Sequence, residues 1–171
     1  MKFIIIFLLV ITSQIITAQQ SENDIPINIV IDEDSIDTEK QGVFKEHNKP
    51  LSYNKSSLIN EDGGSFTYLL NLPKDGYYHV YAWWPSSDSR SNTATDYEIN
   101  HSEGWNKISV NQNINNGKWN SLGHYYFKKN TTHKVTLTNS STGPTVIDAL
   151  RIEYLNQLLC ELLLPNQVCQ Q

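Results

Sequence analysis

The chain has 171 residues, and its 13 Lys or Arg side chains against 18 Asp or Glu give a formal net charge of −5 at pH 7. This acidic balance excludes a protein that binds nucleic acid or anionic lipid through a general basic surface. With 39% hydrophobic residues, a chain of this length has enough apolar side chains for the core of one domain.

Residues 1–18 have the composition of a secretory signal peptide. Lys2 gives a cationic start, an apolar run extends from Phe3 to Ile11, and the small residue Ala18 ends the segment. The alternative is an uncleaved membrane anchor, but this apolar run is well short of the roughly 20 residues that a spanning helix needs. We therefore expect cleavage after residue 18 and a secreted protein, either extracellular or at the cell surface.

The first expected strand, Pro26 to Ile31, is followed by an acidic turn of Asp32, Glu33 and Asp34. Three carboxylates in a row after a strand could hold a hard cation, because Ca²⁺ collects oxygen ligands. The spacing of an EF-hand is absent, and the alternative is a solvated acidic turn. We expect no metal or other cofactor here, with a structural calcium ion as the alternative left open.

The rest of the chain alternates short apolar segments with turn-forming residues. Weak strand signals cover residues 42–47 and 51–53, and stronger signals cover 65–72, 76–84, 94–100, 105–110, 124–127, 133–139 and 145–154. Roughly eight or nine short strands at this spacing predict an all-β protein, a β-sandwich or jelly roll.

The segment from Gly76 to Pro85, GYYHVYAWWP, is the strongest strand signal and is rich in large rings. Strand side chains alternate between faces, so the segment divides into one set suited to the core and one suited to a half-exposed surface that stacks on a flat ligand. The core set is Tyr78, Val80, Ala82 and Trp84, and the surface set is Tyr77, His79, Tyr81 and Trp83.

Residues 155–171 form a leucine-rich tail. Its leucines follow helical spacing until Pro165, which predicts a short C-terminal helix that packs on its own domain. Cys160 and Cys169 are candidates for a disulfide in an exported protein. Because the loop that they would close is short, the bond would stabilise the tail and not the whole domain.

The order of motifs from Gly76 to Tyr154 resembles the golvesin and xanthan-lyase type of carbohydrate-binding-like domain. The matching pieces are GYYHVYAWWP (76–85), Arg90, ATDYEINHSEGW (94–105), VNQ (110–112), GKWNSLGHYYF (117–127), VTLTNSSTG (135–143) and VIDALRIEY (146–154). IVIDED (29–34), followed by Gly42, resembles the opening of that family. The resemblance implies a galactose-binding-like, non-catalytic jelly roll over residues 19–154, of a kind commonly attached to secreted enzymes that act on polysaccharides.

Sugar binding requires flat rings that stack on the apolar face of a pyranose, and planar polar groups that bind its hydroxyls. The candidate stacking rings are Trp83, Trp105 and Trp119, and the candidate hydrogen-bonding groups are Arg90 and Gln112. The alternative for each of these tryptophans is a place in the core or over its open ends.

Asp148 lies in an otherwise apolar segment, where a carboxylate is costly unless it is paired. We expect it to pair with Arg90 or Arg151, or to accept backbone N–H bonds, in preference to contacting a ligand.

The sequence offers no constellation typical of a catalyst. It lacks the Gly-x-Ser-x-Gly elbow, the His-Glu-x-x-His zinc motif and a phosphate-binding glycine loop. Asp96, Glu98 and Glu103 could supply a carboxylate pair for glycan cleavage, but acids alternate along many exposed strands.

We therefore predict a secreted, non-catalytic β-sandwich module that binds polysaccharide or another glycan. The first alternative is a structural or adhesive module that contacts an extracellular protein, with residues 155–171 as the docking element. The second alternative is a small secreted glycan-cleaving enzyme.

Overall fold

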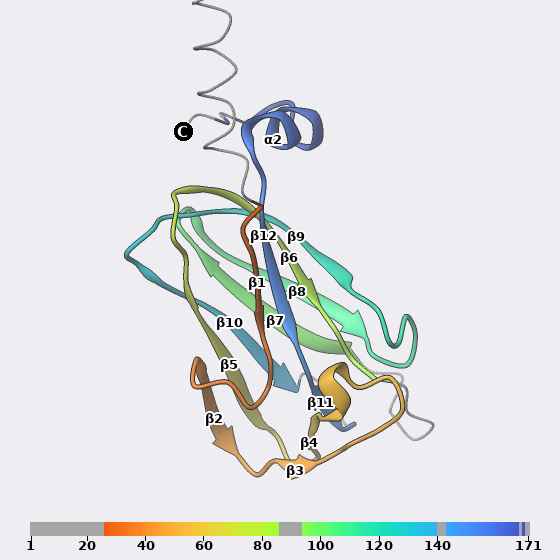
Figure 1. Cartoon of the computed structure of the whole chain (residues 1–171). Coiled ribbons are helices and arrows are strands. Elements are labelled where there is room, and N and C mark those ends of the chain that lie inside the picture. The colour runs from red at the N-terminus through yellow and green to blue at the C-terminus, as the bar shows by residue number, and fades with distance from the viewer. Residues whose placement is uncertain (1–25, 86–93, 140–142, 168, 170–171) are drawn as a thin grey trace, which may run out of the picture.

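The structure, a computed structural model, describes residues 26–85, 94–139, 143–167 and 169 (Figure 1). The expected signal peptide lies outside these residues. The strands are β1 (Asn28–Ile31), β2 (Thr38–Gly42), β3 (Lys45–Glu46), β4 (Leu58–Asn60), β5 (Gly64–Asn71), β6 (Gly76–Ala82), β7 (Ala94–His101), β8 (Gly104–Asn111), β9 (Asn120–Phe127), β10 (Thr132–Asn139), β11 (Thr145–Ile147) and β12 (Leu150–Tyr154). A short 3₁₀ turn, η1 (Tyr53–Lys55), and a helix, α2 (Gln157–Leu163), are the described helical elements.

Two antiparallel sheets pack against each other, with strand orders β1-β12-β6-β9 and β2-β5-β10-β7-β8. A smaller sheet of order β11-β4-β3 lies at one end of this sandwich, and α2 lies at the other (Figure 1). The predicted all-β sandwich with a short C-terminal helix is confirmed.

The core half of β6 is also as predicted. Tyr78, Val80 and Ala82 are fully buried, and Trp84, just after the strand, is 2% exposed. The five-stranded sheet contributes to the same cluster the inward side chains Phe66, Tyr68, Tyr97, Ile99, Val135 and Leu137. The inner faces of both sheets therefore form one hydrophobic core.

The surface half of β6 differs from the prediction at one position. His79, Tyr81 and Trp83 are half-buried, but Tyr77 is buried. The reason is the tail, because Leu155 and Cys160 pack against the Tyr77 ring.

Asn156 caps the N-terminus of α2, because its side-chain oxygen accepts a hydrogen bond from the Leu159 backbone N–H at 3.0 Å. A disulfide joins Cys160 and Cys169, with 5.8 Å between their Cα atoms. Among the described residues, no helix has both the length and the apolar character needed to cross a membrane.

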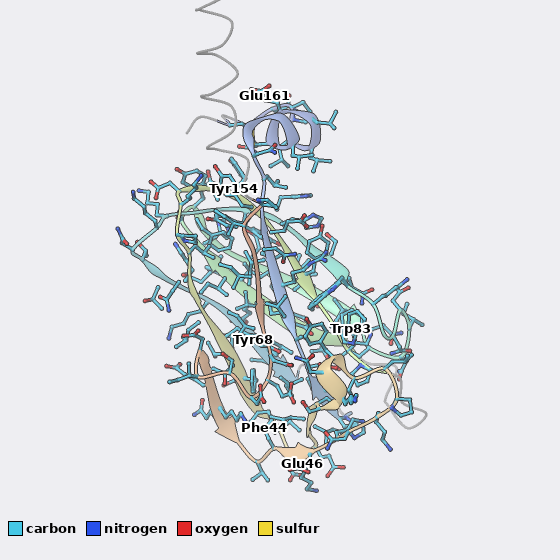
Figure 2. The ribbon with its side chains drawn as sticks, viewed as in Figure 1. Phe44, Glu46, Tyr68, Trp83, Tyr154 and Glu161 are labelled. Atoms are coloured by element: carbon cyan, nitrogen blue, oxygen red, sulfur yellow. A yellow bond between two sulfur atoms is a disulfide. The ribbon has the colours of Figure 1, made fainter. Side chains whose placement is uncertain are left out.

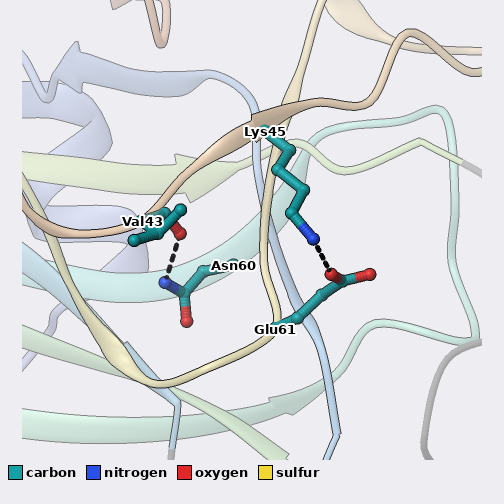
Figure 3. Close-up of polar contacts among 4 residues, drawn as sticks. All are labelled: Val43, Lys45, Asn60 and Glu61. Carbon is teal, nitrogen blue, oxygen red and sulfur yellow. Dashed lines mark hydrogen bonds and ion pairs between the residues drawn. The ribbon is translucent and has the colours of Figure 1, made fainter.

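Two side-chain contacts link the segments around β3 and β4 in the small sheet (Figure 3). The buried Asn60 amide donates from Nδ2 to the carbonyl oxygens of Val43, at 2.9 Å, and Gly63, at 3.0 Å. On the exposed side, Lys45 Nζ lies 2.5 Å from a carboxylate oxygen of Glu61. The bond to Val43 thus ties the chain before β3 to the end of β4.

The single strand expected over 145–154 is wrong, because the segment is divided between β11 in the small sheet and β12 in the four-stranded sheet. Asp148 lies at the break. Its two carboxylate oxygens accept the backbone N–H of Tyr53 at 3.2 and 3.1 Å, and its carbonyl accepts the Tyr68 hydroxyl at 2.8 Å. The expectation that Asp148 accepts backbone N–H bonds is therefore confirmed.

The strand expected over 51–53 is also wrong. Leu51, Asn54 and Lys55 have φ angles of 69°, 45° and 72°, in the left-handed region that a strand does not use. The segment forms η1 in its place, and this turn brings the Tyr53 ring to the end of β6.

Candidate functional site

The three candidate tryptophans lie on two different sheets. Trp83 and Trp119 lie together beside the four-stranded sheet, with ring centroids 5.3 Å apart. Trp105 lies on β8, the edge strand of the five-stranded sheet. The three candidate stacking rings therefore do not share one surface.

Tyr53 joins Trp83 and Trp119 in what we call the aromatic cluster. The Tyr53 centroid lies 5.8 Å from that of Trp83 and 5.3 Å from that of Trp119. Trp83 Nε1 donates to the Leu51 carbonyl at 2.7 Å, and Figure 2 shows the Trp83 side chain beside η1. All three rings are half-buried, so much of their surface is already used in packing against one another.

Arg151 connects this cluster to the outer face of β6. Its guanidinium carbon lies 4.2 Å from the Tyr81 ring centroid and 5.0 Å from that of Trp119. The Tyr81 ring in turn stacks on His79 at 3.8 Å. Sequence reasoning considered Arg151 only as a partner of Asp148; the stacking role depends on the pairing of β12 with β6, which places Arg151 opposite Tyr81.

His79 is held neutral in this row of rings. Its ring lies 3.9 Å from that of His124, and its Nε2 is 2.6 Å from Ser121 Oγ. Burial, aided by the positive charges of His124 and Arg151, lowers the pKa of His79 to about 4. At neutral pH, the stacked side chains of Arg151, Tyr81 and His79 therefore carry the positive charge of Arg151 but no imidazolium charge on His79.

A second surface, which we call the Trp105 groove, lies on the outer face of the five-stranded sheet. It has a volume of ≈ 520 Å³ and is lined by Glu98, Asn100, Trp105, Thr132, Lys134 and Thr136. Trp105 is 69% exposed, and it lies opposite Asn100 in the register of β7 and β8. The groove thus combines one flat apolar ring with an amide, two hydroxyls, a carboxylate and an ammonium group.

Gln112 does not line either surface. It is 3% exposed, its Nε2 donates to the Val146 carbonyl at 2.8 Å, and its Oε1 accepts the Val146 N–H at 2.9 Å. This side chain pairs with β11 as a neighbouring strand would, which corrects its expected role as a ligand contact. Arg90, the other candidate hydrogen-bonding residue, lies outside the described residues.

The carboxylates considered for glycan cleavage do not form a free pair. Asp96 is 2% exposed, with Lys107 Nζ 2.5 Å from its Oδ2 and Ser109 Oγ donating to its Oδ1 at 2.5 Å. Glu98 is exposed in the Trp105 groove, and Glu103 is exposed at the turn between β7 and β8. Asp96 therefore forms an ion pair with Lys107 that joins β7 to β8.

A cluster of three acids lies near η1. Asp32, Glu33 and Asp148 each place a carboxylate oxygen within 4.8 Å of the others. Burial, followed by contact with the Asp32 carboxyl, raises the pKa of Glu33 to about 7. Sequence reasoning grouped Asp34 with Asp32 and Glu33, but Asp34 is exposed and Asp148 supplies the third carboxylate.

The sandwich has the fold found in carbohydrate-binding modules. A CBM35 module from Cellvibrio japonicus matches it with a TM-score of 0.57 at 10% identity, over 74% of this chain and 92% of that one. Residues 29–154 match the profile of the Golvesin C-terminal domain, and the chain belongs to this family. The resemblance inferred from the order of sequence motifs is confirmed.

Two xanthan lyases contain a similar domain. The xanthan lyase of Bacillus sp. (strain GL1) is 28% identical over 127 residues, which are 71% of this chain and 14% of that protein. The structure of Paenibacillus xanthan lyase matches with a TM-score of 0.70 at 27% identity, over 75% of this chain and 13% of the other. The chain therefore spans about one seventh of the length of these relatives.

Proposed function

We propose that the chain is a secreted, non-catalytic carbohydrate-binding module, and that it takes a polysaccharide along the Trp105 groove. The observation that carries this proposal is the 69% exposure of Trp105 over a groove with polar walls. Single exposed apolar side chains are common on protein surfaces, but an exposed indole beside several hydrogen-bonding groups is suited to a partner with one apolar face and a polar rim.

A pyranose has such a face, formed by its C–H groups, and a rim of hydroxyls. The Trp105 ring would stack on the C–H face, while Asn100, Thr132 and Thr136 would bind hydroxyls. Glu98 and Lys134 offer both signs of charge, so the groove suits hydroxyl-rich chains without requiring a strongly charged one. The aromatic cluster is the weaker platform, because the rings of Trp83 and Trp119 pack against Tyr53 and each other.

Secretion is supported by the signal-peptide composition of residues 1–18. Absence of catalysis is supported by the membership in the Golvesin C-terminal domain family and by the use of Asp96 in an ion pair with Lys107. Incubation of the purified protein with polysaccharide should release no reducing ends, whereas release that disappears in Glu98→Gln would establish a glycan-cleaving enzyme.

The binding test is affinity gel electrophoresis on a panel of polysaccharides that includes xanthan, since a similar domain occurs in xanthan lyase. Wild type should be retarded by at least one glycan, and Trp105→Ala should lose at least about tenfold in affinity. Trp105→Phe should keep part of the affinity, because it keeps a flat ring. Ile36→Ala is the matched control, since Ile36 is 96% exposed and lies outside the groove.

The glycan site would instead be the aromatic cluster if Trp105→Ala were retarded as strongly as wild type while Trp83→Ala or Trp119→Ala lost retardation. If no glycan binds and deletion of residues 155–171 abolishes association with an extracellular protein, the module is adhesive and the carbohydrate proposal is wrong.

A further inference from the structure

The charged side chains on the outer face of the five-stranded sheet are not evenly matched in sign. Among the described residues, the outward strand positions of this face carry three carboxylates against two ammonium groups: Glu39, Asp96 and Glu98 against Lys107 and Lys134. This difference leaves one negative charge in excess. The location of that charge depends on which acid lacks a basic partner.

Both lysines of this face already have carboxylate partners. Lys107 Nζ lies 2.5 Å from Asp96 Oδ2, and Lys134 Nζ lies 3.6 Å from Glu39 Oε2. Glu39 lies on β2, which in the sheet order is on the side of β10 away from β7 and β8. The second ion pair therefore extends away from the strand that carries Trp105.

Glu98 is the acid left without an ion pair. In the part of the chain that the structure describes, no Lys, Arg or His nitrogen forms an ion pair with its carboxylate, although Lys107 lies opposite it in the register. Hydrogen bonding to Asp96 raises the pKa of Lys107, and the negative charge of Glu98 adds to this rise. The excess negative charge therefore lies at Glu98, in the wall of the Trp105 groove.

Glu98 and Trp105 are close enough to contact one ligand group together. Trp105 lies opposite Asn100, and Glu98 lies two positions before Asn100 on the same face of β7. Diagonal neighbours of this kind lie about 7–8 Å apart, within reach of aromatic and long side chains. Both side chains are exposed and line the same groove. An indole face and a carboxylate thus flank one stretch of open surface.

This combination is suited to an ammonium group. A cation over the face of an indole is attracted by the ring quadrupole, and a carboxylate beside it adds a charge-assisted hydrogen bond. The carboxylate of a uronic acid would be repelled by Glu98, at a place where both lysines are already paired. A neutral sugar would gain only the stacking contact and the bonds to its hydroxyls.

We propose that the Trp105 groove favours amino-bearing glycans, in which an amino sugar stacks on Trp105 and its ammonium group binds Glu98. This inference rests on the proposed function, because it names the class of glycan that the same groove takes. The hydroxyls of the amino sugar would bind Asn100, Thr132 and Thr136 as those of any hexose would. Glu98 is then the residue that determines specificity.

The test is isothermal titration calorimetry of the full chain at low salt. The ligands are oligosaccharides of glucosamine, of N-acetylglucosamine and of galacturonic acid, matched in length. Wild type should bind the glucosamine oligomer at least about fivefold more tightly than the N-acetylated one, and the galacturonic acid oligomer most weakly. Added NaCl should reduce this preference, because salt screens exposed charges.

Two substitutions in the groove should act in opposite directions. Glu98→Gln should weaken glucosamine binding by about fivefold more than it weakens N-acetylglucosamine binding. Lys134→Gln should strengthen glucosamine binding by about twofold, because the charge of Glu39 is then no longer offset. General damage to the fold would weaken binding in both variants, so opposite changes separate specificity from structure.

Glu46→Gln is the matched control for the loss of one negative charge. Glu46 is an exposed acid on β3, outside the groove, and its substitution should leave the affinities for all three oligomers unchanged.

Three results would overturn the inference. Wild type could bind the N-acetylglucosamine or galacturonic acid oligomer as tightly as the glucosamine oligomer, or Glu98→Gln could weaken the glucosamine and N-acetylglucosamine oligomers equally. The third is that Glu46→Gln weakens glucosamine binding as much as Glu98→Gln, because general negative charge would then attract the cation. In these cases a neutral glycan whose binding is lost in Trp105→Ala still supports the proposed function, whereas a wild type that binds no glycan overturns both.

Discussion

The backbone N–H of Tyr53 points at the carboxylate of Asp148, 3.2 and 3.1 Å from its two oxygens and 95 residues away in sequence. This contact brings η1 to the point where the chain passes from β11 to β12. The Tyr53 ring is thereby placed against Trp83 and Trp119, so one buried carboxylate positions the aromatic cluster.

Two adjacent tryptophans should differ sharply in their contribution to stability. Trp84 is 2% exposed in the core, whereas Trp83 is half-buried in the aromatic cluster. Trp84→Ala should lower the free energy of unfolding by about 3–5 kcal/mol, and Trp83→Ala by roughly half of that or less. Urea denaturation followed by circular dichroism measures both values. Equal losses, or a larger loss for Trp83→Ala, would contradict the assignment of faces along this segment.

Gln112 should be a residue of the fold and not of the binding surface. Gln112→Ala removes the partner of both the N–H and the carbonyl of Val146, which are buried, and should cost about 2–4 kcal/mol. Asn113→Ala is the neighbouring control, and it should cost less because Asn113 is only partly buried. Glycan affinity of the folded fraction should be unchanged; a selective loss of affinity with normal stability would return Gln112 to the binding site.

Acid should destabilise the protein partly through His79. Its pKa is lowered from 6.5 to about 4, so between these values the unfolded chain binds a proton that the folded chain does not. Stability is therefore full above about pH 6.5, falls as the pH drops towards 4, and changes little from this source below that.

Because the His79 ring is partly exposed, we expect a loss of about 1–2 kcal/mol from this residue, less than the full conversion of the pKa shift. His79→Gln should reduce the slope of unfolding free energy against pH in this window. Burial also lowers the pKa of His124 and His133, so the variant should keep part of the acid sensitivity. An identical slope in wild type and variant would show that His79 titrates normally in the folded protein.

The disulfide should stabilise the tail and not the sandwich. Cys160 and Cys169 are separated by only nine positions, so the loop that the bond closes is short and lies outside both large sheets. Closing a loop of this size stabilises by roughly 2–3 kcal/mol where the loop unfolds together with the domain. Because the tail lies outside both large sheets and can open locally, the double variant Cys160→Ser, Cys169→Ser should change the global free energy of unfolding by less than about 1 kcal/mol. Amide exchange in α2 should nevertheless become faster. A loss of several kcal/mol would mean that the tail is part of the cooperative core.

The all-β class, the family and the inward half of β6 could all be predicted from the sequence. These features depend on local alternation and on the order of motifs, which are visible in a single chain. The placement of Trp84 in the core followed from the same period of two residues, because successive strand side chains point to opposite faces.

Which residues share a surface depends on how distant segments pair in the folded protein. Alternation places Trp83 and Trp105 on one face of their own segments, but it does not say which sheet each segment joins. The pairing of β8 with β7 puts Trp105 on the five-stranded sheet, while the aromatic cluster lies beside the four-stranded one. The meeting of Asp148 with Asp32 and Glu33, and the burial of Gln112 against Val146, likewise result from contacts between distant segments, which no local pattern encodes.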